Sequence, residues 1–186
     1  MSVATEQQIP TGTWQLDKIH SSASFAVKHM VVATFRGRFE DFDATLEVGE
    51  DGQANLVGTV NADSIVVKDE NLAAHLKTAD FFDTENYPEL RYEARNLRVE
   101  GDELVVDGEL TIKGNTHPVS GRGALVGPHE DIAGNTKVGI TLETVIDRTQ
   151  FGLEWNAPLP KGGVALANDV TLIVELELAK ADVEEA

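Results

Sequence analysis

Hydrophobic side chains recur at every second position along several stretches of this sequence. Between residues 104 and 112 the apolar positions are Leu104, Val106, Leu110 and Ile112, and charged residues such as Glu109 lie between them. The same alternation runs through residues 138–146 and 170–178. Successive side chains of a β-strand point to opposite faces, so a period of two indicates a strand with one buried face. The chain is therefore predicted to be all-β.

Shorter alternating runs lie at about residues 13–17, 23–28, 35–48, 54–66, 90–99 and 117–126. Tight turns at Glu50-Asp51-Gly52, Glu100-Gly101-Asp102 and Lys113-Gly114-Asn115 separate neighbouring runs. Strands joined this closely must be antiparallel, because a parallel crossover needs a dozen residues or more. A count of about eight or nine long strands favours a closed up-and-down barrel, since closure removes exposed edges. A two-sheet sandwich is the alternative.

One segment departs from the strand pattern. Leu72 and Leu76 lie four residues apart among alanines, and Asp69 precedes them as an N-cap. These signals predict a short helix at about 70–77, followed by a tight turn that ends at Phe81-Phe82 and covers one rim of the barrel. Residues 12–180 are expected to form a single domain, with tails at 1–11 and 181–186.

Composition excludes several function classes. The formal net charge is −17, which makes nucleic acid an unfavourable partner and disfavours an anionic membrane surface. The chain has no cysteine, so disulfides, thiol nucleophiles and thiolate metal sites are excluded. The first ten residues lack a secretory signal, and no stretch approaches the ~20 apolar residues of a membrane helix. We expect a cytoplasmic protein without stable membrane insertion.

Catalytic and cofactor motifs are missing from the sequence. There is no Gly-x-Ser-x-Gly elbow and no Walker loop, and the five histidines are scattered. We therefore expect a protein that is not an enzyme and needs no cofactor or metal. A site assembled in space from His20 or His29 with Asp17 stays open. Because His29 shares a strand face with Phe25 and Val27, it is either a bonded core residue or a polar anchor for a ligand.

Three groups of motifs, taken in order, carry a resemblance. The first comprises Trp14-Gln-Leu-Asp-Lys-Ile-His-Ser21, Phe25-Ala-Val-Lys-His29 and Gly37-Arg-Phe39. The second comprises His75-Leu76, Asp80-Phe81-Phe82-Asp83 and Tyr87-Pro88. The third comprises Gly108-Glu-Leu-Thr111, Lys113-Gly114-Asn-Thr-His-Pro118 and Arg148-Thr-Gln-Phe151-Gly152.

Their order and spacing resemble the YceI family of polyisoprenoid-binding, lipocalin-like proteins. One departure is visible: an Arg-Asp pair that the family often has before the helical His-Leu is replaced here within Asn71-Leu72-Ala73-Ala74. The resemblance implies an extended eight-stranded antiparallel barrel, often dimeric, that holds an isoprenoid chain. The expected function is transport, storage or sequestration of a polyprenyl phosphate or an isoprenoid quinone.

Two other functions stay open. One is an enzyme that uses the same cavity, with His29 or His20 as acid–base residue or metal ligand. The other is a structural or stress-response barrel without a ligand. Lipid binding requires an unfilled apolar interior, where each buried methylene contributes about 0.8 kcal/mol.

The residues expected to bind the ligand are inward-facing apolar and aromatic side chains together with His29. They are Phe25, Val27, His29, Phe39, Phe42, Phe81, Phe82, Leu110, Ile112, Ile140, Leu142, Ile146, Phe151, Leu172 and Val174. If the ligand ends in a phosphate, a cation is expected at the mouth of the barrel. Lys28, His29, Arg148 and Lys161 are the candidates for that position.

Overall fold

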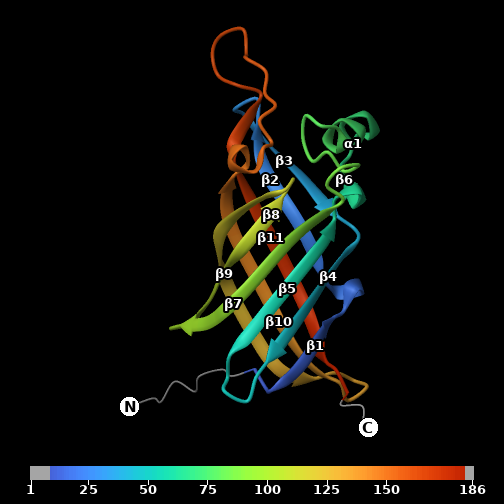
Figure 1. Cartoon of the computed structure of the whole chain (residues 1–186), viewed down its shortest axis with the longest axis vertical. Helices are drawn as coiled ribbons and strands as arrows, with labels where there is room; N and C mark the ends of the chain where they lie inside the picture. Colours follow the sequence, from blue (N-terminus) through green and yellow to red (C-terminus); the bar gives the residue numbers. More distant parts are fainter. Residues whose placement is uncertain (1–8, 183–186) are drawn as a thin grey trace.

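A single antiparallel sheet dominates the computed structural model, which describes residues 9–182 (Figure 1). One α-helix and three short 3-10 helices interrupt the strands. The elements are β1 (Gly12–Leu16), η1 (Lys18–His20), β2 (Ser22–His29), β3 (Ala33–Phe39), β4 (Phe42–Val48), β5 (Ala54–Asn61), η2 (Ala62–Ser64), β6 (Ile65–Val66), α1 (Glu70–Lys77), β7 (Glu89–Glu100), β8 (Glu103–Ile112), β9 (Asn115–Glu130), β10 (Thr136–Asp147), η3 (Arg148–Phe151) and β11 (Leu166–Lys180).

The sheet closes on itself through eight strands. The hydrogen-bonded order β1-β4-β5-β7-β8-β9-β10-β11 returns to β1, because β11 also pairs with β1. Every pairing in this ring is antiparallel. The predicted eight-stranded antiparallel barrel is therefore confirmed, and the alternative of a two-sheet sandwich is wrong.

The remaining strands extend one side of this ring. The C-terminal part of β11, at the lower end of the barrel in Figure 1, pairs with β1 at Leu178↔Leu16. Its N-terminal part, at the upper end, pairs with β2 between Val170↔Val27 and Glu175↔Ser22. Strands β1 and β2 thus act as one long strand interrupted by η1, and β3 and β4 act as another. The predicted runs 35–48 and 54–66 were each taken as one strand, whereas the structure divides both.

The lower half of the barrel is packed solid. Trp14, Leu46 and Leu178 have no exposed surface, and they meet inside the barrel with residues from β8 and β10. The indole Nε1 of Trp14 donates a hydrogen bond to the Pro10 carbonyl oxygen at 3.0 Å, which satisfies the one polar atom of that side chain. We call this cluster the lower plug: Trp14, Leu46, Val48, Ala54, Leu104, Val106, Val138, Ile140 and Leu178.

The segment before β1 contacts the barrel, although the sequence assigned it to a tail. Ile9 packs against the hydrophobic cluster that contains the lower plug, and the hydroxyl of Thr11 donates to the Gly49 carbonyl at 3.3 Å. The rest of the predicted tails, residues 1–8 and 183–186, lies outside the described residues.

The helical insert has the predicted bounds. Helix α1 spans Glu70–Lys77, and a carboxylate oxygen of Asp69 accepts a hydrogen bond from the backbone N–H of Leu72 at 2.8 Å. Leu76 is the buried residue of the helix. In the turn that follows, Phe82 makes an edge-on contact with Phe39 of β3, with 5.7 Å between the ring centroids. The insert therefore covers the upper end of the barrel beside β3 and β6 (Figure 1). None of the helices within residues 9–182 has the length and apolar character needed to span a bilayer.

Candidate functional site

An unfilled cavity of about 580 Å³ occupies the upper half of the barrel, above the lower plug. This volume lies within the ~300–1,000 Å³ range of small-molecule sites in proteins. Hydrophobic side chains from the barrel strands, α1 and the segment between η3 and β11 make up most of its wall. Apolar surface of this kind favours an apolar occupant, because it offers few partners for water.

The structure gathers nearly all of the predicted ligand-binding residues around this cavity. Those that line it are Phe25, Val27, His29, Phe39, Phe42, Phe81, Phe82, Leu110, Ile112, Leu142, Ile146, Phe151, Leu172 and Val174. Ile140 faces inward as alternation requires, but it belongs to the lower plug and does not line the cavity. Alternation identifies an inward face and cannot tell which level of the barrel is filled.

The predicted head-group cations divide into two classes. Arg148 lines the cavity and is 95% buried, since only 5% of its surface is exposed. Lys28 and Lys161 are exposed and do not line the cavity. His29 lines the cavity yet is exposed, so it lies at the rim and the interpretation as a core residue is wrong.

A tyrosine marks the floor of the cavity. Tyr92 lines the cavity and packs against both hydrophobic clusters, and its hydroxyl donates to the carbonyl oxygen of Val119 at 2.8 Å. Burial raises the pKa of Tyr92 to about 12, so the phenol is neutral near pH 7. Gly108 makes room for this ring, because a Cβ there would lie 2.7 Å from the ring atom Cζ.

An aromatic cluster forms part of the upper wall of the cavity. The imidazole of His75 in α1 stands edge-on to Phe81 and to Trp155, with ring centroids 5.1 Å away in both cases. A hydrogen bond of 2.9 Å between His75 Nε2 and an Asp80 carboxylate oxygen orients the imidazole. Sequence reasoning missed His75 and Trp155 as wall residues. The His75-Leu76 motif was an available signal, whereas Trp155 follows η3 in an irregular loop without periodicity.

Arg148 owes its position to a cap at the end of β10. A carboxylate oxygen of Asp147 accepts from the Thr149 N–H at 2.9 Å, and Gly152 ends η3 in the left-handed region at φ 77°. This tight turn points the Arg148 side chain back towards the segment that leads to β11. Its Nε donates to the Ala167 carbonyl at 2.9 Å, and its Nη1 donates to the carbonyls of Leu153 and Trp155.

One nitrogen of this guanidinium has no partner. Arg148 Nη2 is buried, and no hydrogen-bond acceptor reaches it within the described part of the chain. All the bonds that Arg148 makes there are to backbone carbonyls, so none of them supplies a negative charge. Burial lowers the pKa of Arg148, but a guanidinium keeps its proton in proteins. A buried cation with a free N–H donor at a cavity wall is suited to an oxygen acceptor on a bound molecule.

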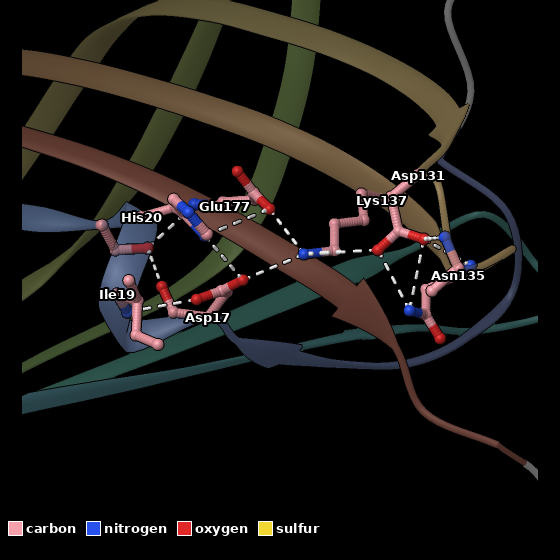
Figure 2. A network of polar contacts seen from close by, with 9 residues as sticks. Asp17, Ile19, His20, Asp131, Asn135, Lys137 and Glu177 are labelled. Carbon is pink, nitrogen blue, oxygen red and sulfur yellow. Dashed lines mark hydrogen bonds and ion pairs between the residues drawn. The ribbon is translucent and has the colours of Figure 1, made fainter.

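A second polar arrangement lies on the outside of the lower barrel (Figure 2). Lys137 Nζ forms ion pairs with a carboxylate oxygen of Asp17 at 2.9 Å and of Glu177 at 2.6 Å. His20 Nδ1 is 3.0 Å from the same Asp17 oxygen. Hydrogen bonds from His20 and Lys137 hold the pKa of Asp17 well below its usual range. We call these four residues the lower network.

The geometry of the lower network bears on the predicted role of His20 as a metal ligand or acid–base residue. Ligand atoms of Asp17, His20 and Glu177 lie within 4.8 Å of one another, as a metal site would require. The ammonium group of Lys137 already pairs with both carboxylates, so the arrangement serves as a salt-bridge network joining β10, β11 and η1. His20 does not line the cavity, and the alternative that places it there is wrong. His29 belongs to the rim and is not part of this cluster.

The lower network leads to a pH-dependence prediction. The hydrogen bond to Asp17 raises the pKa of His20, so the folded protein holds this proton more tightly than the unfolded chain. The resulting stabilisation is complete below the unfolded pKa of about 6.5 and is lost as the pH rises through the higher folded value. We expect His20→Gln to lower Tm at about pH 5.5 and to leave it nearly unchanged at about pH 9. Thermal unfolding at both pH values measures this, and an equal difference at the two would contradict it.

Comparisons with known proteins agree with this architecture. The family model described as a YceI-like domain matches residues 14–178. The UPF0312 proteins of Staphylococcus aureus strains N315 and USA300 are each 31% identical over 169 residues, which covers 88% of this chain and 95% of the relative.

Solved structures share the fold at lower identity. BcnA of Burkholderia cenocepacia superposes with a TM-score of 0.74 at 20% identity, over 87% of this chain and 98% of its own. The YCEI protein of Campylobacter jejuni gives 0.70 at 21% identity, over 83% and 90%. A polyisoprenoid binding domain from Saccharophagus degradans gives 0.61 at 13% identity, over 90% and 98%.

Proposed function

The chain belongs to the YceI-like domain family, and from this premise we propose that it binds one long isoprenoid lipid in the upper half of its barrel. The observation that carries the proposal is the apolar cavity of about 580 Å³ between the lower plug and the aromatic cluster of α1. Burial of each methylene there is worth about 0.8 kcal/mol, so a chain of many such groups gains affinity from length and shape. The polyisoprenoid binding domain of Saccharophagus degradans has the same fold and supports this ligand class.

The polar end of the ligand is proposed to lie at Arg148. This side chain is the buried cation of the cavity wall, and its Nη2 lacks a partner among the described residues. A phosphate or a quinone carbonyl would both supply an acceptor oxygen, which would meet Nη2 after a small shift of the side chain, because that nitrogen has almost no exposed surface. Because the hydrogen bonds of the guanidinium all go to carbonyls, and the neighbouring Asp147 carboxylate acts on it only through space, an anionic head gains more than a neutral one. We therefore favour a polyprenyl phosphate over an isoprenoid quinone.

The role that follows is carriage or sequestration of the lipid without chemical change. The rival reading as a ligand-free barrel required a filled interior, and the upper half is not filled. The alternative of an enzyme named His29 or His20 as the reactive group. Of these two histidines only His29 lines the cavity, and it lies at the exposed rim. Binding alone accounts for the apolar wall and for a single buried cation.

Lipid extraction tests the ligand class directly. The protein is purified without detergent, its lipid is extracted into organic solvent, and mass spectrometry identifies what it carried. We expect about one isoprenoid per chain, and titration of stripped protein with geranylgeranyl monophosphate should saturate at the same ratio. Straight-chain fatty acids as the dominant co-purified lipid, with no binding of geranylgeranyl monophosphate, would overturn the proposal.

Arg148 gives a second, more specific prediction. We expect Arg148→Met to weaken binding of geranylgeranyl monophosphate by roughly 10- to 100-fold, since hydrogen bonds to charged groups contribute about 1.5–3 kcal/mol. Binding of the hydrocarbon phytane, which has no head group, should change little. The comparison of two ligands on one variant separates loss of the head contact from a general disturbance of the cavity. An equal loss for both ligands would assign Arg148 a purely structural role.

A further inference from the structure

The hairpin turn between β2 and β3 exposes three hydrophobic side chains in succession. The exposed fractions are 40% for Met30, 67% for Val31 and 84% for Val32. The segment between η3 and β11 adds Val164 at 46%, and a Cβ on Gly163 would lie 3.5 Å from Val31, so the two segments touch. We call these four side chains the apolar tip. In Figure 1 the two segments form the upper end of the molecule, at the mouth of the cavity.

The backbone of this turn is unfavourable for the residues it carries. Met30 has φ 50° and Val31 has φ 67°, a region that favours glycine or asparagine and penalises a β-branched side chain. The usual compensation for such a conformation is contact inside the protein, yet Val31 is largely exposed, and Met30, which also contacts the cavity rim, is only partly covered. A turn that gives up favourable residues in order to display hydrophobic ones points to a contact outside the molecule.

Charge indicates what that contact is. The chain as a whole carries −17, but residues 28–36 around the turn contain Lys28 and Arg36 and no acidic residue, and residues 155–168 contain one lysine and no acidic residue. Lys28 and Lys161 are exposed within these segments. The net charge that disfavours anionic surfaces is thus unevenly distributed: residues 68–85 of the helical insert, at the same end of the barrel, are acidic overall, whereas the two segments that form the apolar tip itself carry only positive formal charges.

We propose that the apolar tip docks the barrel onto an anionic phospholipid surface, with Lys28 and Lys161 near the lipid phosphates. Hydrophobic side chains flanked by lysines are the combination that interfacial membrane binding uses. The tip is continuous with the cavity, since His29, Met30 and Ala165 line it. The inference deepens the proposed function, because docking there faces the cavity mouth towards the bilayer that would supply an isoprenoid.

Vesicle flotation tests the docking surface. Stripped protein is mixed with phosphatidylcholine–phosphatidylglycerol vesicles that contain no isoprenoid, and with vesicles of phosphatidylcholine alone. We expect binding to the anionic vesicles that salt weakens, and a loss of about tenfold or more in Val31→Asp/Val32→Asp. Lys28→Gln/Lys161→Gln should reduce binding to anionic vesicles and diminish its salt dependence. The control is Ile132→Asp, which replaces a fully exposed hydrophobic side chain by one aspartate in the β9–β10 turn at the other end, and it is matched in charge to the single variant Val32→Asp.

Two results would overturn docking while leaving the proposed function intact. One is wild-type protein that stays unbound on anionic vesicles but still takes up geranylgeranyl monophosphate from solution. The other is a tip variant that binds vesicles as wild type does but abolishes a dimer seen by analytical ultracentrifugation, which would assign the tip to a second copy of the chain. Normal vesicle docking together with failure to bind any isoprenoid would instead refute the proposed ligand and keep the surface.

Discussion

Replacement of Val174 by tryptophan is expected to reduce affinity for geranylgeranyl monophosphate about 100-fold. Val174 lies on β11 and lines the cavity next to Leu142, its partner across the ladder. An indole at this position projects into empty space and displaces part of the isoprenoid chain. Exclusion of about four methylenes at ~0.8 kcal/mol each removes ~3 kcal/mol of binding free energy, which is roughly a hundredfold. Isothermal titration of the stripped protein measures the effect.

The fold should tolerate this substitution. Overpacking destabilises a core when no room exists for the new atoms, and here the cavity provides it. We expect Tm to change by no more than a few degrees. Val126→Trp is the matched control, because Val126 is 55% exposed on β9 and should leave affinity unchanged. Wild-type affinity in Val174→Trp would show that the lipid does not occupy the barrel.

Truncation of Trp14 to alanine should have the largest effect on stability. Its side chain has no exposed surface and fills the lower plug, where removal leaves a void that neighbouring strands cannot close. Substitutions of this kind cost about 3–5 kcal/mol of the free energy of unfolding. Trp14 does not line the cavity, so the fraction of the variant that stays folded should bind lipid normally. Urea unfolding followed by circular dichroism measures the free energy of unfolding.

The second tryptophan of the chain is the natural comparison. Trp155 is partly buried over the cavity, in contact with His75 and Phe81. We expect Trp155→Ala to weaken lipid binding more than it weakens the fold, the reverse of Trp14→Ala. If Trp14→Ala lost lipid affinity at conditions where it remains folded, the division between plug and cavity would be wrong.

Alternation predicted the barrel because its physical cause is local. Each residue of a strand faces the interior or the solvent according to its parity, so Leu104, Val106 and Leu110 could be assigned from neighbours alone. The division of 35–48 was also encoded, since inward positions are odd up to Phe39 and even from Phe42. The change from odd to even positions falls at Glu40 and Asp41, between β3 and β4, and the prediction of a single strand over 35–48 did not take it into account.

The level at which the barrel is filled could not be predicted from periodicity. Ile140 and Leu142 share one face of β10, yet the first lies in the plug and the second lines the cavity. The difference depends on side chains that other strands bring to each level, such as Trp14 of β1, and the local pattern does not contain them. The free nitrogen of Arg148 is equally non-local, because it depends on how the backbone carbonyls of 153, 155 and 167 surround the guanidinium.

The lower plug closes one end of the cavity, so a lipid that binds there as proposed cannot pass through the barrel from end to end. The hydrocarbon tail of such a lipid must enter the cavity first and its polar end last. The lipid then leaves from the end by which it entered. A second lipid cannot enter the cavity until the first has dissociated. Exchange should accordingly proceed at the intrinsic departure rate, however concentrated the competing lipid, and delivery would be governed by whatever accelerates that departure.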